Sequence, residues 1–166
     1  MNNKLDQKWT YWADDGRKTD EITYSNGIKS GLYISWNNDN YKVVEGEYLK
    51  DEKHGTWTLW YDDGTMKGKE SYSNGEMDGQ WTWWRPNGIK DRDGNYKNGV
   101  KHGLWVSWNN DDHKKGEETY VNGILDGLVT VWHDNGNKDR EGIVRGNQKE
   151  GNWTYFNGNG LSLIHI

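Results

Sequence analysis

Two histidines are the residues of this chain whose type and spacing most suggest chemistry. His54 and His102 belong to one series with Asp78 and Asp126, whose members follow one another at 24-residue steps. Imidazole and carboxylate groups serve as metal ligands and as general acids or bases. If each residue begins a β-hairpin, neighbours in the series stand two strand spacings apart, about 9.6 Å, which is too far for one shared ion. We therefore expect solvated polar side chains at these strand starts, with no metal, no cofactor and no catalytic residue.

Carboxylates form a second series, in which Lys69 interrupts the regular spacing. The members are Glu21, Glu45, Asp93, Glu117 and Glu141. A glycosidase needs two carboxylates that face each other across roughly 5 to 9.5 Å within a cleft. A column of carboxylates on an open sheet supplies no such enclosure. The sequence therefore predicts a protein that is not an enzyme.

Tryptophan forms a third series, again at 24-residue steps, with Phe156 in the last position. These candidate binding residues are Trp12, Trp36, Trp60, Trp84, Trp108 and Trp132. Tryptophan is enriched at binding hot spots, and exposed aromatic patches often mark contact sites. The alternative is that these rings simply pack the sheet, and the sequence leaves both interpretations open.

All three series follow from one internal repeat, which covers nearly the whole chain. Glycine recurs at a constant 24-residue interval from Gly31 to Gly151, and Gln7 takes the same place in the first copy. Such a fixed period is typical of a repeat architecture. We divide the chain into a polar lead (1–6), a seven-copy array (7–160) and an atypical apolar tail (161–166). The copies start at residues 7, 31, 55, 79, 103, 127 and 151.

Each copy contains two strand-like runs and two turn signals. The first turn is Asp-Gly or Asn-Gly, as at Asp15-Gly16, and the second is Asn-Gly, as at Asn26-Gly27. Both dipeptides favour the positive φ angles of two-residue type I′ turns. Two strands and two turns account for the full length of a copy. The sequence therefore predicts an all-β fold, an elongated single-sheet antiparallel meander of about 13 strands.

Two-residue turns also predict which residues face each other across neighbouring strands. The expected neighbours are Gly94 and Gly68 for Trp81, Gly142 and Gly116 for Val129, Val44 and Glu70 for Trp57, and Arg92 and Glu118 for Trp105. Aromatic or apolar side chains over bare glycine backbone then occur only in alternate copies, which indicates that the true period is two copies long.

Side chains alternate between the two faces of a strand, so tryptophans three residues apart point to opposite sides. One face collects Trp57 and Trp105 with the strand-end tyrosines and the glycines, and we expect it to be the packing face. The other collects the Trp36, Trp60 and Trp84 series with threonines and carboxylates. We expect this second face to meet a partner protein.

Composition narrows the function further. The formal charge is −5, which argues against nucleic acid because phosphate binding requires clustered Lys and Arg. There is no cysteine, and the first residues show no apolar run after a basic stretch. We therefore expect a cytoplasmic protein whose partner is another protein. A sheet face or edge also offers a route to homo-oligomers.

The repeat pattern resembles a known family. G-x-W-x-x-W-x-x-N-G followed by E-G-x-Y-x-x-G-x-x-x-G, seen in residues 79–103 and partly in 45–60, is similar to the bacterial variant of the MORN repeat, including antitoxins of the YwqK family. The resemblance covers residues 7 to about 160. It implies stacked hairpins and a scaffold for protein contacts, with antitoxin-like roles in some members. Membrane binding, known for some eukaryotic members, needs a basic surface that this composition lacks.

Two further features leave alternatives open. Residues 151–160, GNWTYFNGNG, resemble choline-binding or glucan-binding repeats, which implies a carbohydrate- or choline-binding module of a cell-wall protein. The final LSLIHI fits neither pattern. It resembles read-through of a cloning adapter, and it also fits a terminal strand that covers the last sheet edge.

Overall fold

The computed structural model describes residues 6–165, which form fourteen β-strands. The first seven strands are β1 (Gln7–Trp12), β2 (Lys18–Ser25), β3 (Ile28–Trp36), β4 (Lys42–Leu49), β5 (Glu52–Trp60), β6 (Met66–Ser73) and β7 (Glu76–Trp84). The others are β8 (Lys90–Lys97), β9 (Val100–Trp108), β10 (Lys114–Val121), β11 (Ile124–Trp132), β12 (Lys138–Arg145), β13 (Gln148–Phe156) and β14 (Ser162–His165). The described residues contain no helix, and hence none that could span a membrane.

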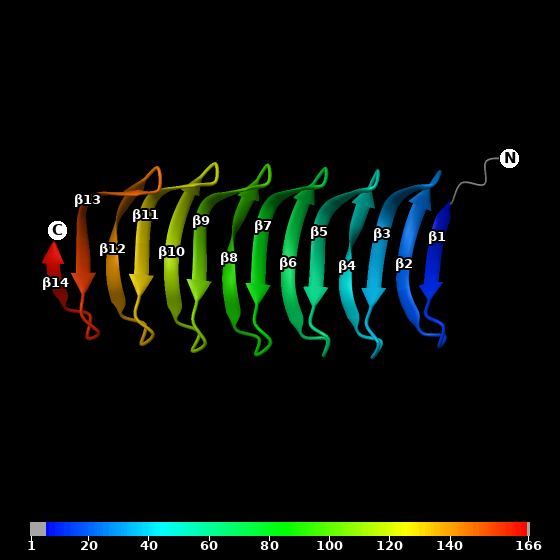
Figure 1. The fold of residues 1–166 in the computed structure, drawn as a ribbon, viewed down its shortest axis with the longest axis horizontal. Coiled ribbons are helices and arrows are strands. Elements are labelled where there is room, and N and C mark those ends of the chain that lie inside the picture. Colours follow the sequence, from blue (N-terminus) through cyan, green and yellow to red (C-terminus); the bar gives the residue numbers. More distant parts are fainter. Residues whose placement is uncertain (1–5, 166) are drawn as a thin grey trace. The chain divides into compact units, whose positions relative to one another are not determined.

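The sheet order from β1 to β14 is the chain order, and consecutive strands pair antiparallel (Figure 1). This confirms the all-β meander that the sequence predicts. The fourteenth strand, one more than the approximate count, comes from the apolar tail, where Ile164 pairs with Tyr155 of β13. The chain divides into two compact units within β7, unit 1 ending at Gly79 and unit 2 beginning at Gln80. Most of the predicted polar lead lies outside the described residues.

The second turn of each copy is the two-residue turn that the sequence predicts. Asn26 and Gly27 have φ angles of 53° and 83°, and both values lie in the left-handed region that a type I′ turn needs. Lys50-Asp51 adopts the same geometry with φ angles of 54° and 68°, although neither residue is glycine. The flanking strands therefore impose the turn even where the preferred dipeptide is missing.

The first turn differs from the prediction of a type I′ turn. Only Gly16 has a positive φ, and the amide of Gly16 donates to the carbonyl of Ala13 while the amide of Ala13 donates to the carbonyl of Arg17. This is a three-residue loop built on a type I turn, with glycine in the left-handed position. Asp15 stabilises it by accepting a hydrogen bond from the Arg17 amide at 3.1 Å. Asp therefore serves here as a side-chain acceptor and not as a left-handed residue.

A bulge beside each first turn restores the predicted register across it. Trp57 pairs with Glu70, Trp105 pairs with Glu118, and Val129 pairs with Gly142, as predicted. Each ladder also shifts by one residue near its loop, for example between Leu59 and Trp60. The bulged residue compensates for the longer loop, so the pairing of the strand centres is unchanged.

Across the second turn the predicted register is wrong by two residues. Val44 pairs with Leu59 instead of Trp57, Arg92 pairs with Ser107 instead of Trp105, and Val129 pairs with Glu118 instead of Gly116. The strand pairing shifts by two residues close to the glycine that starts each copy. Gly55, for example, has a positive φ of 67°. Positive φ favours glycine and often marks a bulge. Because the slip is two residues, every side chain stays on its predicted face.

This slip places tryptophan over glycine in copies other than those predicted. A Cβ built on Gly46 would lie 2.3 Å from the ring of Trp57, and Gly94 and Gly142 stand equally close under Trp105 and Trp153. Ile22, Glu70 and Glu118 hold the same place in the copies between. The predicted two-copy period is therefore present, but the tryptophans that cover glycine lie in the other set of alternate copies, those that start at residues 55, 103 and 151.

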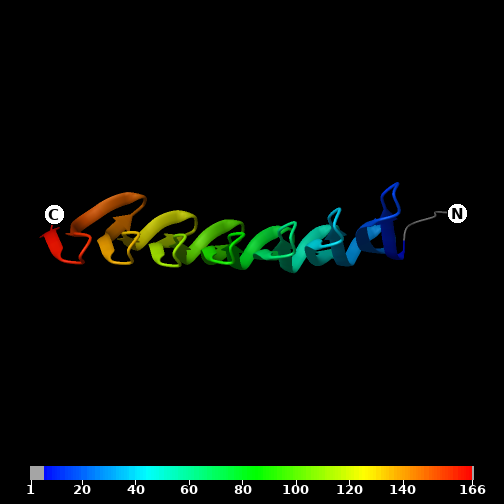
Figure 2. The same ribbon diagram turned by 90° about the horizontal axis from the view of Figure 1, so that it is seen from below.

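The covered indoles are the best-buried large side chains of the structure. Trp57, Trp105 and Trp153 are 2%, 6% and 5% exposed. Each indole N–H donates to the backbone carbonyl ten residues earlier, at 3.0 to 3.2 Å. The strands of each unit curve out of the sheet plane (Figure 2). Burial of these rings agrees with the assignment of their side as the packing face, although the other face also has buried residues, Ile34, Thr82 and Thr130.

Candidate functional site

The predicted binding residues lie on one face, which we call the tryptophan-column face. In unit 1 the column consists of Trp12, Trp36 and Trp60, and in unit 2 of Trp84, Trp108 and Trp132. Trp12 is 61% exposed, and the other five rings are half-buried. The column rings therefore differ from the buried indoles of the packing face and keep part of their surface in solvent.

Lysines lie between the rings of the column, and each is matched by a carboxylate three residues later. The ion pairs are Lys18–Glu21, Lys42–Glu45, Lys90–Asp93, Lys114–Glu117 and Lys138–Glu141, at 2.5 to 3.0 Å. The ammonium of Lys18 also lies 4.8 Å from the ring centre of Trp36, and that of Lys90 lies 5.1 Å from Trp108. The carboxylate series that suggested acid–base chemistry thus neutralises lysines that stack on tryptophan.

The opposite face, which we call the tyrosine face, carries a continuous ring cluster in each unit. In unit 1 the ring centres of Tyr48 and Tyr72 lie 5.0 and 6.3 Å from that of Trp57. In unit 2 Tyr96 lies 4.9 Å from Trp81 and 5.1 Å from Trp105. These edge-on contacts are the favourable geometry for aromatic pairs.

Lysines also lie over the rings of the tyrosine face, and sequence reasoning missed them. Lys53 lies 4.3 Å from Trp57 and 4.6 Å from Tyr72, and Lys101 lies 4.4 Å from Trp105. Among the described residues neither ammonium has a carboxylate within ion-pair distance. The signal was available, because lysine recurs at the same place of four copies, at Lys29, Lys53, Lys101 and Lys149.

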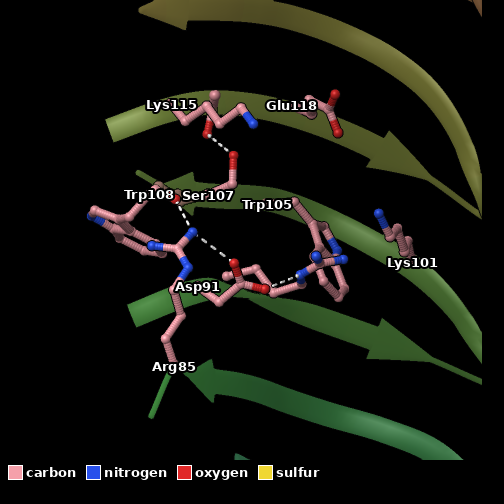
Figure 3. A pocket seen from close by; sticks show the side chains of 11 residues that line it. Arg85, Asp91, Lys101, Trp105, Ser107, Trp108, Lys115 and Glu118 are labelled. Carbon is pink, nitrogen blue, oxygen red and sulfur yellow. Dashed lines mark hydrogen bonds and ion pairs between the residues drawn. The ribbon is translucent and has the colours of Figure 1, made fainter. Parts of the chain in front are cut away.

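Unit 2 also contains a groove that the sequence did not predict. Two adjoining cavities of about 410 and 260 Å³ share Asp91, Arg92, Lys101 and Trp105 in their linings. Figure 3 shows the smaller cavity, with Lys115 and Glu118 on one strand, Trp105 and Ser107 on the next, and Asp91 on the third. The groove is open to solvent along the tyrosine face and reaches the turn region at Trp108.

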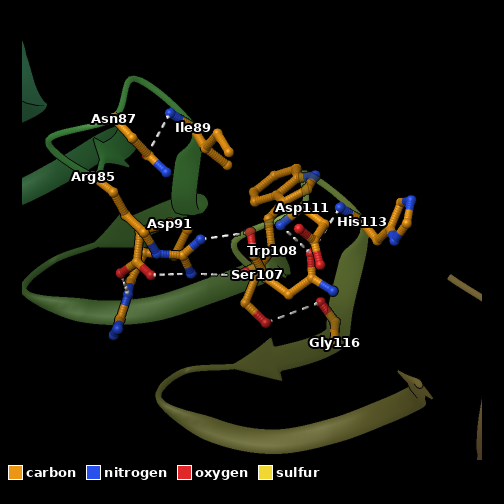
Figure 4. Close-up of polar contacts among 11 residues, drawn as sticks. Arg85, Asn87, Ile89, Asp91, Ser107, Trp108, Asp111, His113 and Gly116 are labelled. Atoms are coloured by element: carbon orange, nitrogen blue, oxygen red, sulfur yellow. Dashed lines mark hydrogen bonds and ion pairs between the residues drawn. The ribbon is translucent and has the colours of Figure 1, made fainter. Parts of the chain in front are cut away.

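An arginine fixes one end of this groove. The guanidinium of Arg85 donates to the carbonyls of Trp108 and Asn109 and to Asp91 Oδ1 at 2.8 Å (Figure 4). The other carboxylate oxygen of Asp91 accepts from Nε of Arg92 at 3.0 Å. Asp91 therefore has both oxygens engaged, and it holds Arg92 at the groove wall.

The two histidines of this series do not join a larger group of possible metal ligands within the part of the chain that the structure describes. No group of three or more histidines and carboxylates comes together among residues 6–165. His54 pairs with Glu47 and His102 with Asn95 across their ladders, and both side chains are half-buried. Their Nδ1 atoms are buried without a hydrogen-bond partner, which differs from the fully solvated positions that we expected.

The pKa is raised for several tyrosines of the tyrosine face, among them Tyr33 and Tyr120. Burial, together with a hydrogen bond to Glu118 at 2.7 Å, raises the pKa of Tyr120 to about 12, and burial with the Asp20 contact does the same for Tyr33. The unfolded chain loses these protons near pH 10. Between pH 10 and 12 the folded state therefore holds more of these protons than the unfolded chain. The contribution of the two tyrosines to the free energy of unfolding is fully present below pH 10 and is lost as the pH rises towards 12. Carbon-13 NMR of labelled tyrosine should show both late titrations, and Glu118→Gln should lower the pKa of Tyr120 alone.

Comparison with known families agrees with this architecture for part of the chain. Residues 53–74 and 77–98 each match the family model described as "MORN repeat variant". The second match begins one copy length after the first, and the two coincide with the β5–β6 and β7–β8 hairpins. No curated protein matches the chain significantly. Residues 53–98 of this protein are therefore similar to the MORN repeat variant.

Proposed function

We propose that this chain is a non-catalytic interaction module that binds another protein through the tryptophan-column face. The proposal rests on two properties of the column, the exposed surface of its rings and the ion pairs of its lysines. Its rings keep solvent-exposed surface, while the lysines between them are neutralised within the same face. A partner can then cover apolar rings without burying an unpaired charge, which is the costly part of forming an interface.

The family match supports the same class of function, because MORN repeats generally act as non-catalytic interaction modules. An antitoxin acts by binding its toxin, so an antitoxin-like role in the cytoplasm is one form of this proposal. Its support is the resemblance of the repeat pattern alone.

The test removes one ring from unit 1 and two from unit 2. We expect Trp60→Ala, Trp84→Ala and Trp108→Ala together to abolish capture of the partner from lysate of the source cells, with the β-sheet circular dichroism largely kept. The control is Trp9→Ala, which removes a more exposed ring (43%) from the tyrosine face. Loss of the circular dichroism signal in the triple variant would show that the column is core, and undiminished capture would overturn the proposal.

The choline-binding alternative is not favoured by the ring geometry. A quaternary ammonium would be held between aromatic faces, but Lys53 already occupies that place between Trp57 and Tyr72, and Lys149 lies 4.4 Å from Trp153. The protein's own ammonium groups fill these sites, so we do not propose this function.

A further inference from the structure

The groove of unit 2 combines an aromatic wall with an unfilled floor. Trp81, Trp83, Tyr96 and Trp105 line the larger cavity, and Ser107 and Gly116 lie in the smaller one. Ser107 pairs with Gly116 across β9 and β10. In unit 1 the same pair of repeat positions is Leu59 and Gly68. Serine leaves the floor of the smaller cavity open, whereas Leu59 carries a larger side chain at the same repeat position.

The charge of the groove is opposite to that of the whole chain. Four cationic side chains line it, Arg85, Arg92, Lys101 and Lys115, against the carboxylates of Asp91 and Glu118. Asp91 is engaged by the two arginines, and Glu118 accepts a hydrogen bond from Tyr120. Within the described residues, no carboxylate forms an ion pair with Lys101 or Lys115. In a chain of formal charge −5, this groove presents positive charge that the protein does not neutralise.

Exposure makes this charge available to a ligand. The side chain of Arg92 is 61% exposed even though Asp91 holds its Nε, and Lys115 is exposed. Lys101 is kept over Trp105 and Tyr120 at 4.4 and 4.6 Å. A ligand that fits must therefore supply negative charge at separated points and apolar groups between them.

We propose that this groove binds an extended acidic peptide segment, with carboxylate side chains received by Arg92, Lys101 and Lys115 and apolar side chains lying on the aromatic wall. Single ammonium groups spaced along a groove each receive one carboxylate, whereas phosphate favours converging donors such as a set of backbone N–H groups. The strands beneath the groove already use their backbone N–H groups in the sheet. The site lies mainly on the tyrosine face and shares Trp108 with the tryptophan column, and as a peptide-binding groove it goes beyond the proposed function.

The repeat itself supplies variants that the fold should accept. Val44 and Thr19 hold the repeat positions of Arg92 and Lys115, so Arg92→Val with Lys115→Thr removes two groove cations using residues already found there. Met66 holds the position of Lys114 and Lys138. The double variant Lys114→Met and Lys138→Met therefore has the same charge change, on the opposite face, and serves as the matched control.

The experiment is fluorescence anisotropy with a labelled ten-residue peptide in which pairs of Glu and Leu alternate, so that either side of the extended chain carries both. We expect the Arg92→Val/Lys115→Thr variant to bind about tenfold more weakly, as for the loss of two exposed charge contacts. The control variant should bind within about twofold of the wild type, and raising the salt should weaken the wild-type complex because these charges are exposed.

A second variant tests the shape of the groove independently of charge. Ser107→Leu fills the floor with the side chain that Leu59 supplies in unit 1, and we expect it to weaken peptide binding with unchanged thermal stability. Equal binding of the peptide with Gln in place of Glu would overturn the proposal. So would tight binding of inorganic phosphate, or of vesicles containing anionic phospholipid, in the absence of peptide binding. The groove variants leave Trp108 and the other column tryptophans unchanged, so capture through the tryptophan column can be measured separately on the same proteins.

Discussion

Trp57→Ala is expected to destabilise unit 1 by about 3 to 5 kcal/mol, the range for removing a fully buried aromatic side chain. Trp57 is 2% exposed, and its ring covers Gly46. Its N–H donates to the carbonyl of Glu47 at 3.2 Å, and its ring centre lies 5.7 Å from that of Tyr33. Alanine removes all of these contacts and leaves the glycine backbone open to water.

The matched control is Trp12→Ala, because Trp12 has the same side chain but is 61% exposed. We expect its cost to stay below about 1 kcal/mol, as for most surface substitutions. Repeat proteins often depart from two-state unfolding, so hydrogen exchange should accompany denaturation by urea. Faster exchange confined to β4, β5 and β6 would agree with the expected role of Trp57. Equal urea midpoints for the two variants would show that the covered indoles are not the core of the unit.

Much of the fold follows from the constant repeat period together with the turn dipeptides. The strands, the antiparallel order and the side on which each tryptophan lies are all consequences of alternation along a strand. The predicted faces are correct although the predicted register is wrong, because the bulge at Gly55 displaces the pairing by two residues and so preserves the alternation of side chains. A one-residue slip would have exchanged the two faces.

The register itself could not be read from the sequence, because a bulge is a local choice between nearly equal backbone pairings. Glycine at the start of each copy was visible, but its positive φ was not, and Trp57 was placed opposite Val44 instead of Gly46. The first turn was misassigned for a similar reason. Asp-Gly suits both a two-residue type I′ turn and a three-residue loop with glycine last, and only the bulge in the next strand distinguishes them.

The candidate site was partly predictable. The tryptophan series and its carboxylates recur at 24-residue steps with one exception each, Phe156 and Lys69, so the sequence placed them on one face, and the role of the tryptophans in binding stays a prediction. The groove of unit 2 depends on Ser107, Arg92 and Lys115, whose repeat positions hold residues of different kinds in different copies. Such positions carry no periodic signal, and the proximity of these three residues emerges only when β8, β9 and β10 are paired.

Gly46→Ala is the second substitution for which we expect a large effect, although the repeat consensus suggests none. Ile22 holds the same repeat position, so a comparison of copies would permit a side chain here. The structure does not, because a Cβ at Gly46 would lie 2.3 to 2.6 Å from three atoms of the Trp57 indole. The rigid ring must be displaced from its buried place. We expect a loss of about 3 kcal/mol, near the upper end for overpacked cores.

Gly116→Ala is the matched control for this effect. Gly116 also lies in the second strand of a hairpin without a positive φ, and its added Cβ would meet the flexible hydroxyl of Ser107 at 3.2 Å. We expect this change to cost less than about 1 kcal/mol. A double-mutant cycle then isolates the contact itself. If the ring is the obstacle, Gly46→Ala should cost little in a chain that already carries Trp57→Ala, because alanine at position 57 leaves room for the new methyl group. An undiminished cost in that background would mean that glycine is required at position 46 by the backbone, and that the indole merely occupies the space beside it.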